Sequence, residues 1–274
     1  EWFKNFDNLN NWYKNNSEQG VILLNQGISY NDYNNLYSNN RAFKSGACVH
    51  LEGILTVIVS KSAMKNNSAD FTGGTIYCIS SKQVALITNT LFQNQAVRGA
   101  AIYLENADIF YQKGCKYVQN KVLVRGKERG GTVVVERSSL TTILHCTFIN
   151  NLAFTDGSGI FAFNGQMLQI KLCKFAGNKA ESNGGGLAGL QVKFILLYSV
   201  EFTRQMAHHL GGAVYVNSQN RKCQLELVNV HFVSNSAKLD GGAFYIANVN
   251  KISVLKTTFI SDHASHMGGS IYVS

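Results

Sequence analysis

One short pattern recurs nine times along this chain of 274 residues, and no other feature limits its fold as strongly. Each copy opens with an aromatic or large apolar residue. Asn follows three positions later, Ala two positions after that, and Gly near the ninth position. The openers are Tyr37, Met64, Leu91, Tyr117, Phe148, Phe175, Phe202, Phe232 and Phe259, at spacings of 27, 27, 26, 31, 27, 27, 30 and 27 residues. Such a period is typical of solenoids, propellers and repeat arrays.

The repeat units have the pattern of β-strands. Their apolar runs are short, rich in β-branched and aromatic residues, and separated by Gly, Asn and Ser. Propeller blades need about 40 residues or more, and no leucine-rich spacing recurs. The chain contains no Pro, which fits a parallel sheet that uses nearly every backbone N–H. We therefore predict an all-β fold, a right-handed parallel β-helix of about nine to ten coils stacked about 4.8 Å apart, each with three short strands and three turns.

Stacked coils place identical repeat positions in columns along the solenoid. The polar column three residues after the opener contains Asn40, Asn67, Asn94, Asn120, Asn151, Asn178, Gln205, Asn235 and Asp262. Asn in a turn can donate and accept along such a stack. We therefore predict an internal, structural ladder that satisfies turn backbone groups which would otherwise be buried and unpaired.

Adjacent strand residues face opposite sides, so the aliphatic column after each Gly must point inward and the next column outward. The outward column contains His50, Tyr77, Tyr103, Val134, Phe161, Ala188, Tyr215, Tyr245 and Tyr272. We predict that its five tyrosines, Tyr77, Tyr103, Tyr215, Tyr245 and Tyr272, form exposed rows that bind sugar rings or another protein. The alternative is that these rows only stabilise neighbouring strands.

The paired motifs resemble a known repeat family. "FINN" (148–151), "FAGN" (175–178) and "FVSN" (232–235), followed by "GGAVY" (211–215) and "GGAFY" (241–245), are similar to the F-x-x-N and G-G-A-[ILV] repeats of the chlamydial polymorphic outer membrane proteins and of related protist surface proteins. The resemblance covers roughly residues 36–274, and Gln205, Asp262 and Leu187 depart from it. It implies a right-handed parallel β-helix and an extracellular or cell-surface, adhesive or structural role.

Residues 1–35 are less regular and are predicted to form an N-terminal cap with a degenerate first coil around Tyr13, Asn16 and Gly20. Trp2, Phe3 and Phe6 are expected to cover the end of the core. Residues 36–274 form the repeat region, which stops inside a strand-like run and is expected to continue beyond this segment. No apolar run approaches the roughly 20 residues of a membrane-spanning helix, so we predict no membrane span in this segment.

The formal net charge is +9, which is compatible with nucleic acid, anionic glycans or acidic lipids as partners. The basic residues are scattered, apart from "RGKER" (125–129) in an insertion. No aromatic-basic recognition module accompanies them, so we do not expect nucleic acid. The expected partners are other protein chains or glycans, and no cofactor is expected.

Candidates for chemistry are few. Glu105 and Glu136 should stack as outward neighbours, with Arg137 next along. They are the weak candidates for a calcium or sugar-acid site, and the alternative is a pair neutralised by nearby Arg or Lys. His208, His209, His263 and His266 fall in turns and are expected to be surface polar groups, although Asp262 could complete a metal site with them.

Three cysteines, Cys115, Cys146 and Cys173, share one column two residues before the opener. Small residues fill this column elsewhere, so we expect buried free thiols. Asn15 and Asn66 begin N-x-S triplets and are possible glycosylation sites.

The sequence thus favours a non-catalytic extracellular or cell-surface scaffold, structural or adhesive, that binds glycans or proteins through its ladder faces. A pectin-lyase-like carbohydrate enzyme is the first alternative, although the Asp, His and Arg motifs of pectate lyases and polygalacturonases are not recognisable. A structural subunit of a large assembly is the second alternative.

Overall fold

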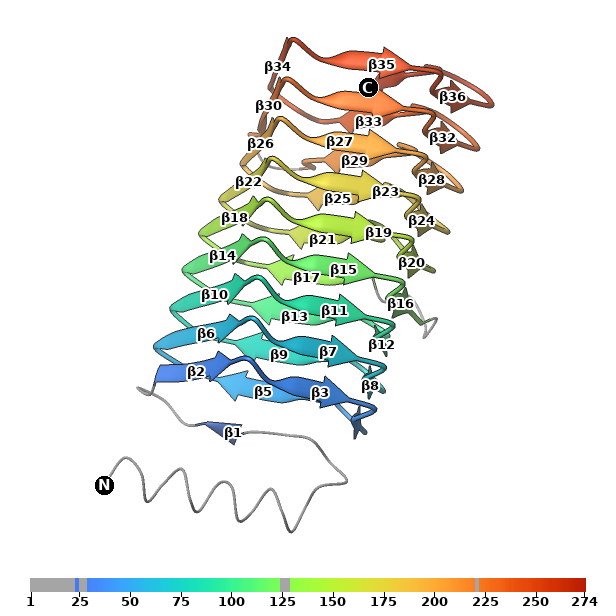
Figure 1. The fold of residues 1–274 in the computed structure, drawn as a ribbon. Coiled ribbons are helices and arrows are strands. Elements are labelled where there is room, and N and C mark those ends of the chain that lie inside the picture. The colour runs from blue at the N-terminus through green and yellow to red at the C-terminus, as the bar shows by residue number, and fades with distance from the viewer. Residues whose placement is uncertain (1–22, 25–28, 124–128, 220–221) are drawn as a thin grey trace, which may run out of the picture.

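The structure, a computed structural model, describes residues 23–24, 29–123, 129–219 and 222–274. In these residues the fold is all β, and four parallel sheets run along an elongated solenoid (Figure 1). We name the sheets A to D. Each coil contributes one strand to sheets B, C, D and A in chain order, and the next coil repeats this order.

Sheet A contains β1 (Leu23–Leu24), β5 (Val49–Glu52), β9 (Ile76–Ile79), β13 (Ile102–Glu105), β17 (Val133–Glu136), β21 (Ile160–Phe163), β25 (Leu187–Leu190), β29 (Val214–Asn217), β33 (Phe244–Ala247) and β37 (Ile271–Val273). Sheet B contains β2 (Ser29–Tyr33), β6 (Thr56–Ser60), β10 (Gln83–Ile87), β14 (Ile109–Lys113), β18 (Leu140–Leu144), β22 (Met167–Lys171), β26 (Phe194–Tyr198), β30 (Gln224–Val228) and β34 (Lys251–Leu255). Sheet C contains β3 (Leu36–Ser38), β7 (Ala63–Lys65), β11 (Thr90–Phe92), β15 (Lys116–Val118), β19 (Thr147–Ile149), β23 (Lys174–Ala176), β27 (Glu201–Thr203), β31 (His231–Val233) and β35 (Thr258–Ile260). Sheet D contains β4 (Arg41–Ala42), β8 (Ser68–Ala69), β12 (Gln95–Ala96), β16 (Lys121–Val122), β20 (Leu152–Ala153), β24 (Lys179–Ala180), β28 (Met206–Ala207), β32 (Ser236–Ala237) and β36 (His263–Ala264).

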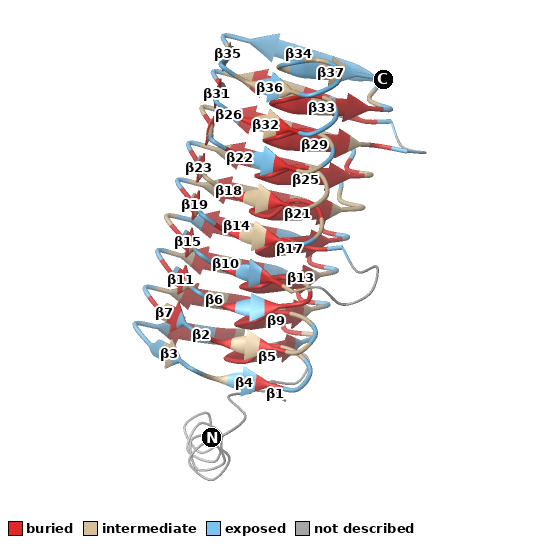
Figure 2. Ribbon diagram, turned by 90° about the vertical axis from the view of Figure 1, so that its right-hand side faces the viewer, coloured by how far each residue is buried: buried red, intermediate tan, exposed pale blue. Residues whose placement is uncertain are grey.

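The predicted parallel β-helix is confirmed, with nine complete coils from β2 to β37. The coils pair in register, so that Phe148 lies beside Phe175 and Phe175 beside Phe202. Followed from its N-terminal end, the chain winds with the predicted right-handed sense (Figures 1 and 2). In-register pairing is what converts each repeat position into a column of side chains.

The prediction of three strands per coil is wrong, because each coil has four. The additional strand, in sheet D, is only two residues long and ends at the repeated Ala or its Val122 substitute. It pairs with the same dipeptide of the next coil, as Leu152 does with Lys179. A two-residue strand has no alternation of its own, so its pattern could not be separated from a turn.

The openers form the centre of the core. Rings of consecutive coils stack almost parallel, and the Phe148 and Phe175 centroids lie 4.7 Å apart at an interplanar angle of 3°. Tyr117, Phe148, Phe175, Phe202 and Phe232 are fully buried. The centroid separation follows the coil spacing of about 4.8 Å, so ring stacking and backbone pairing reinforce each other.

The internal Asn ladder is confirmed. Asn67, Asn94, Asn120, Asn151, Asn178 and Asn235 are buried, with exposed fractions of 0 or 1 %. The Asn120 backbone N–H donates to Asn151 Oδ1 at 2.9 Å, and the Asn120 side-chain amide donates to the same oxygen at 3.0 Å. The amide also donates to the Leu91 carbonyl of the preceding coil at 3.0 Å. Each buried Asn therefore joins three successive coils.

A left-handed corner joins sheet B to sheet C in every coil. It is formed by the residue after each sheet B strand: Asn34, Lys61, Thr88, Gly114, His145, Leu172, Ser199, Asn229 and Lys256, with φ between 49° and 65°. The backbone N–H of a corner residue donates to the carbonyl of the residue just before the corner in the next coil. Leu172 N–H, for example, donates to the Tyr198 carbonyl at 2.9 Å. Backbone pairing between coils therefore continues through the corner.

Several predicted features lie outside the described residues: Trp2, Phe3 and Phe6 of the cap, Tyr13, Asn16 and Gly20 of the degenerate coil, the Asn15 glycosylation triplet, and residues 124–128 of the insertion. Regular stacking begins before residue 36, because β1 pairs with β5 and β2 pairs with β6. Both β1 and β2 fall within residues 1–35, for which a cap with a degenerate first coil is predicted. In the described part of the chain, no helix is long and apolar enough to cross a bilayer.

Candidate functional site

The five predicted tyrosines lie on the outer face of sheet A, separate from the main core. Tyr77 and Tyr103 are stacked, with ring centroids 5.5 Å apart at 9°. Tyr215 and Tyr245 lie 5.5 Å apart at 31°, and Tyr245 and Tyr272 lie 5.1 Å apart at 14°. The two predicted rows are therefore present, and they face away from the core.

The expectation that these rows are exposed is wrong for two of the five rings. Tyr103 is 3 % exposed and Tyr215 is 9 % exposed, whereas Tyr77, Tyr245 and Tyr272 are half-buried. The rows end in a second apolar cluster that includes Val134, Phe161, Ala188 and Leu190, with Leu210 packed against it. Burial also raises the pKa of the Tyr215 phenol. The centre of this face therefore offers little aromatic surface to a ligand.

Glu105 and Glu136 lie side by side, as predicted. The Tyr103 hydroxyl is 2.7 Å from Glu105 Oε2 and 3.0 Å from Glu136 Oε2. Arg137 forms an ion pair with Glu105, and Arg98 forms one with Glu136. Burial and the Glu136 charge raise the pKa of the Tyr103 phenol. This arrangement matches the alternative interpretation of a neutralised pair, in which both carboxylates are engaged by arginine.

The turn histidines do not converge with Asp262. His208 Nδ1 lies 2.5 Å from Glu181 Oε2, and His266 Nδ1 lies 2.7 Å from Asp240 Oδ1. His209 and His263 are exposed. Asp262 instead accepts two hydrogen bonds from Asn235, at 2.9 and 2.8 Å, as the last member of the Asn ladder. Within the described residues, no group of three His, Cys, Asp or Glu side chains is arranged to hold a metal ion.

A second polar ladder was missed. Asp156 is 3 % exposed, and its Oδ1 accepts hydrogen bonds from the backbone and side-chain N–H groups of Asn183 at 3.0 and 2.9 Å. Asn183 Oδ1 accepts from the Leu210 N–H at 3.1 Å, and Asp240 Oδ1 accepts from the Met267 N–H at 3.0 Å. These side chains precede the left-handed Gly of their coils. The available signal was their common position eight residues after the opener.

All six cysteines are buried and free, as expected for the thiol column. Cys146 N–H donates to Cys173 Sγ at 3.3 Å, which shows the close stacking of this column. Asn66 is exposed at a left-handed turn, with φ of 55°. Its side chain donates to Asn39 of the preceding coil at 3.3 Å.

The outer face of sheet B, which lies along one edge of the view in Figure 1, carries partly exposed apolar side chains on its middle coils. Every second side chain of each five-residue strand points outward. The apolar members on the middle coils are Ile109, Tyr111, Leu140, Leu144, Met167, Phe194, Leu196 and Tyr198. Ile109 is 40 % exposed and Tyr198 44 % exposed, and the others are partly exposed. The sequence analysis did not predict this face, because polar and apolar residues alternate less clearly in its strands than in the strands that carry the tyrosine rows.

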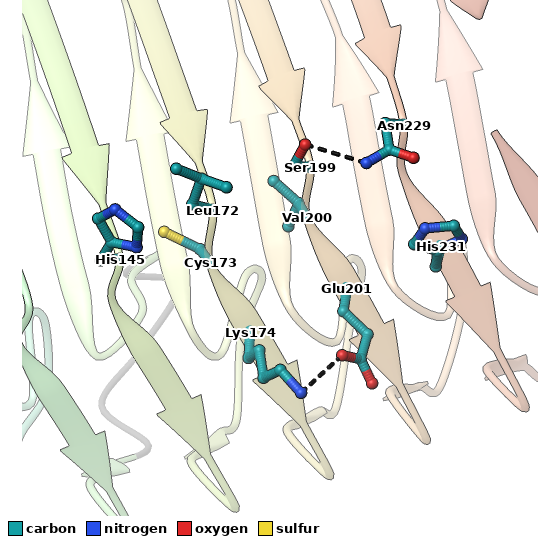
Figure 3. A pocket seen from close by; sticks show the side chains of 9 residues that line it. All are labelled: His145, Leu172, Cys173, Lys174, Ser199, Val200, Glu201, Asn229 and His231. Atoms are coloured by element: carbon teal, nitrogen blue, oxygen red, sulfur yellow. Dashed lines mark hydrogen bonds and ion pairs between the residues drawn. The ribbon is translucent and has the colours of Figure 1, made fainter. Parts of the chain in front are cut away.

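A groove of about 280 Å³ follows the corner from sheet B to sheet C (Figure 3). Cys173 and Val200 are buried at its base, and the exposed Leu172 lies along it. Figure 3 also shows that Ser199 and Asn229 bond to each other beside the groove, at 3.0 Å. Lys174, Glu201, His145 and His231 complete its lining. The groove thus combines an apolar base with hydrogen-bonding and charged groups.

In comparisons with known proteins, no family model, no curated protein and no solved structure matches this chain. The family resemblance of its repeats therefore stays a prediction.

Proposed function

We propose that this chain is a non-catalytic scaffold of the extracellular space or cell surface that binds its partner through the outer face of sheet B. The observation that carries the proposal is the apolar surface on β14, β18, β22 and β26, where Ile109 and Tyr198 are 40 % and 44 % exposed. Contiguous exposed apolar surface of this kind marks interaction sites in soluble proteins.

The size of the face supports a macromolecular partner. A five-residue strand is about 17 Å long and nine stacked strands cover about 40 Å, which gives a flat face of roughly 700 Å², of which the four apolar strands make up roughly 300 Å². One partner contributes about 800 Å² to an interface of standard size. A single protein surface or a packed set of glycan chains would therefore match this face.

The geometry of the acidic pair supports a non-catalytic role. Carbohydrate-cleaving enzymes use two carboxyl groups that hold or accept a proton at the scissile bond. Glu105 and Glu136 are instead held by Arg137 and Arg98, with Tyr103 between them. They act here as structural groups on the outer face of sheet A.

The test compares two double variants of equal charge. Leu140→Gln with Leu196→Gln changes the outer face of sheet B, and Ala176→Gln with Val233→Gln changes outward positions of sheet C as the control. Beads coated with the protein should bind cells or glycan surfaces. The sheet B variant should lower that binding at least about tenfold, and the control should retain it. Equal binding by both variants would remove sheet B from the proposal.

Two further outcomes would favour the alternatives. Release of reducing ends or unsaturated sugars from polygalacturonate, abolished by Glu136→Gln, would favour a carbohydrate enzyme. Oligomers in light scattering that dissociate in the sheet B variant, without any glycan or cell binding, would favour a subunit of an assembly.

A further inference from the structure

The corner between sheets B and C carries an uneven charge distribution. Three outward columns meet there: the last residue of each sheet B strand, the left-handed corner residue, and the first residue of each sheet C strand. In these columns, all of whose members are described, the basic residues are Lys61, Lys113, Lys116, His145, Lys171, Lys174, His231 and Lys256. Glu201 is their only carboxylate. The corner therefore has a basic surface.

Two lysine pairs lie two coils apart. Lys113 and Lys116 flank the corner on one coil, and Lys171 and Lys174 flank it two coils further along. The intervening coil carries Leu144, His145 and Thr147 at the same positions. Because coils repeat about every 4.8 Å, the two pairs are about 10 Å apart along the axis. The spacing suits a linear polymer whose anionic groups recur at about that interval.

Most of this charge is not compensated within the protein. Lys174 Nζ lies 2.9 Å from Glu201 Oε2, and this hydrogen bond lowers the pKa of Glu201. Among the described residues, no carboxylate forms an ion pair with Lys113, Lys116 or Lys171. Clustered charges of one sign attract counter-charged ligands from solution. The corner is therefore suited to an anion and retains a positive field after its one ion pair is formed.

The shape of the corner favours an extended chain over a compact small molecule. The groove volume of about 280 Å³ is below the range of about 300–1,000 Å³ typical of small-molecule pockets. Its lining runs along the corner from His145 and Lys174 to Asn229 and His231 (Figure 3), and Lys113, Lys116 and Lys171 lie on the same corner outside that lining. Ser199 and Asn229 supply hydroxyl and amide groups, and Leu172 supplies an exposed apolar surface. These are the contacts that a sugar ring uses: hydrogen bonds at its edge and C–H groups on its face.

We propose that this corner binds a linear acidic polysaccharide laid along the solenoid axis, with its carboxylate or sulfate groups on Lys113, Lys116 and Lys171 and its sugar rings in the groove. The inference rests on the proposed function, since it names the ligand class of a binding scaffold. Nucleic acid fits less well, because single strands need an aromatic platform for successive bases. In these columns only Tyr33 and Tyr198 are Tyr, Phe or Trp, on coils far apart.

The test measures affinity for a heparin-derived oligosaccharide and a polygalacturonate oligosaccharide, with neutral dextran as the uncharged probe. The corner variant is Lys113→Gln, Lys116→Gln and Lys171→Gln. The control, Lys82→Gln, Lys193→Gln and Lys238→Gln, removes the same charge from exposed positions outside the corner. At least one acidic oligosaccharide should bind. The corner variant should bind it at least about tenfold more weakly, since three charge-assisted contacts are lost, and the control should stay within about threefold.

Three results would overturn the inference. Equal losses in both variants would mean that net charge alone attracts the polysaccharide. If neither acidic oligosaccharide binds, acidic polysaccharides are excluded as the ligand class. Tighter binding of a thymidine oligonucleotide, lost in the corner variant, would make the corner a nucleic-acid site. Lys113 and Lys171 are the last outward residues of β14 and β22, but the corner variant leaves every apolar side chain of the sheet B face in place. The sheet B variant in turn leaves these lysines unchanged, so the two proposals can fail separately.

Discussion

Oδ1 of Asn178 accepts two hydrogen bonds from Asn151 in the preceding coil, from its backbone N–H at 3.0 Å and from its side-chain amide at 2.9 Å. The Asn178 amide in turn donates to the Phe148 carbonyl at 3.0 Å. The two residues are fully or almost fully buried. One side chain therefore satisfies two donors and one carbonyl of the preceding coil, and its removal leaves these buried groups without their partner.

Replacing Asn178 by Ala should lower the free energy of unfolding by about 1–3 kcal/mol, because Asn151 keeps two buried donors without their acceptor. Chemical denaturation followed by circular dichroism measures this change. Gln166→Ala, which removes an exposed amide, is the control and should change stability by less than about 0.5 kcal/mol. Equal stability of the Asn178 variant and the wild type would show that the ladder adds nothing to the free energy of folding.

Gln205 is the weak member of the ladder. Its Oε1 accepts from the Asn178 amide at 3.0 Å, but its own amide donates to Thr203, two residues away, at 2.8 Å. The usual bond from the Asn178 backbone N–H to the next side chain is not formed in this part of the structure. Gln205→Asn should keep the bond from the Asn178 amide, add the missing bond from the Asn178 N–H, and stabilise the protein by about 1 kcal/mol. A lower melting temperature would show that the longer side chain fills necessary space.

Tyr103→Phe should test the charged cluster on sheet A. The variant loses the hydroxyl that contacts Glu105 and Glu136, and stability at pH 8 should fall by about 1–3 kcal/mol. The pKa of Tyr103 is raised in the folded protein, whereas an unfolded tyrosine ionises near pH 10. Its contribution is therefore complete below about pH 10 and is lost as the pH rises through the folded pKa.

The difference in the free energy of unfolding between the wild type and Tyr103→Phe, measured by urea denaturation, should accordingly become smaller between pH 8 and pH 11. Tyr198→Phe, which changes an exposed ring, should match the wild type at both pH values. A constant difference across this range would mean that the Tyr103 proton is not linked to folding.

The cysteines should be unreactive in the folded protein. Burial raises the pKa of Cys78 to about 11 and also raises the pKa of Cys48. At pH 8 only about one Cys78 thiol in a thousand is a thiolate, and the thiolate is the nucleophile. Mass spectrometry after brief alkylation should detect less than one modified thiol per chain on average, and all six after denaturation. Rapid modification of Cys173 in the folded state would show that the base of the corner groove opens.

The sequence was sufficient to predict the repeat, the parallel coil, the core openers and the Asn ladder, because each depends on one residue type at a fixed position. Gln205 and Asp262 were correctly assigned to the ladder although they differ from Asn. Sheet D was missed because a two-residue strand has no period to detect. The error therefore concerned how each coil is divided into strands, while the stacking of the coils was predicted correctly.

The candidate sites were harder to predict. The outward direction of Tyr103 and Tyr215 followed from strand alternation, but their burial depends on Arg98 and Leu210, which come from loops between sheets D and A. Strand alternation predicts on which side of the sheet a side chain lies, but it does not predict whether residues from neighbouring loops cover that side chain. The corner groove combines residues from several coils, such as Lys174 and His231, and no single copy of the repeat contains enough of them to be noticed.

The left-handed corner between sheets B and C has a consequence for how this protein could change over time. Lysine, threonine, histidine, leucine, serine and asparagine all occupy it with φ between 49° and 57°. Such a conformation costs an ordinary side chain about 1–2 kcal/mol, and here backbone pairing with the adjacent coils offsets it. The fold therefore places little demand on which residue stands at the corner. A substitution at one corner therefore changes the surface of a single coil, and with it what that coil can bind, while the pairing between coils is retained.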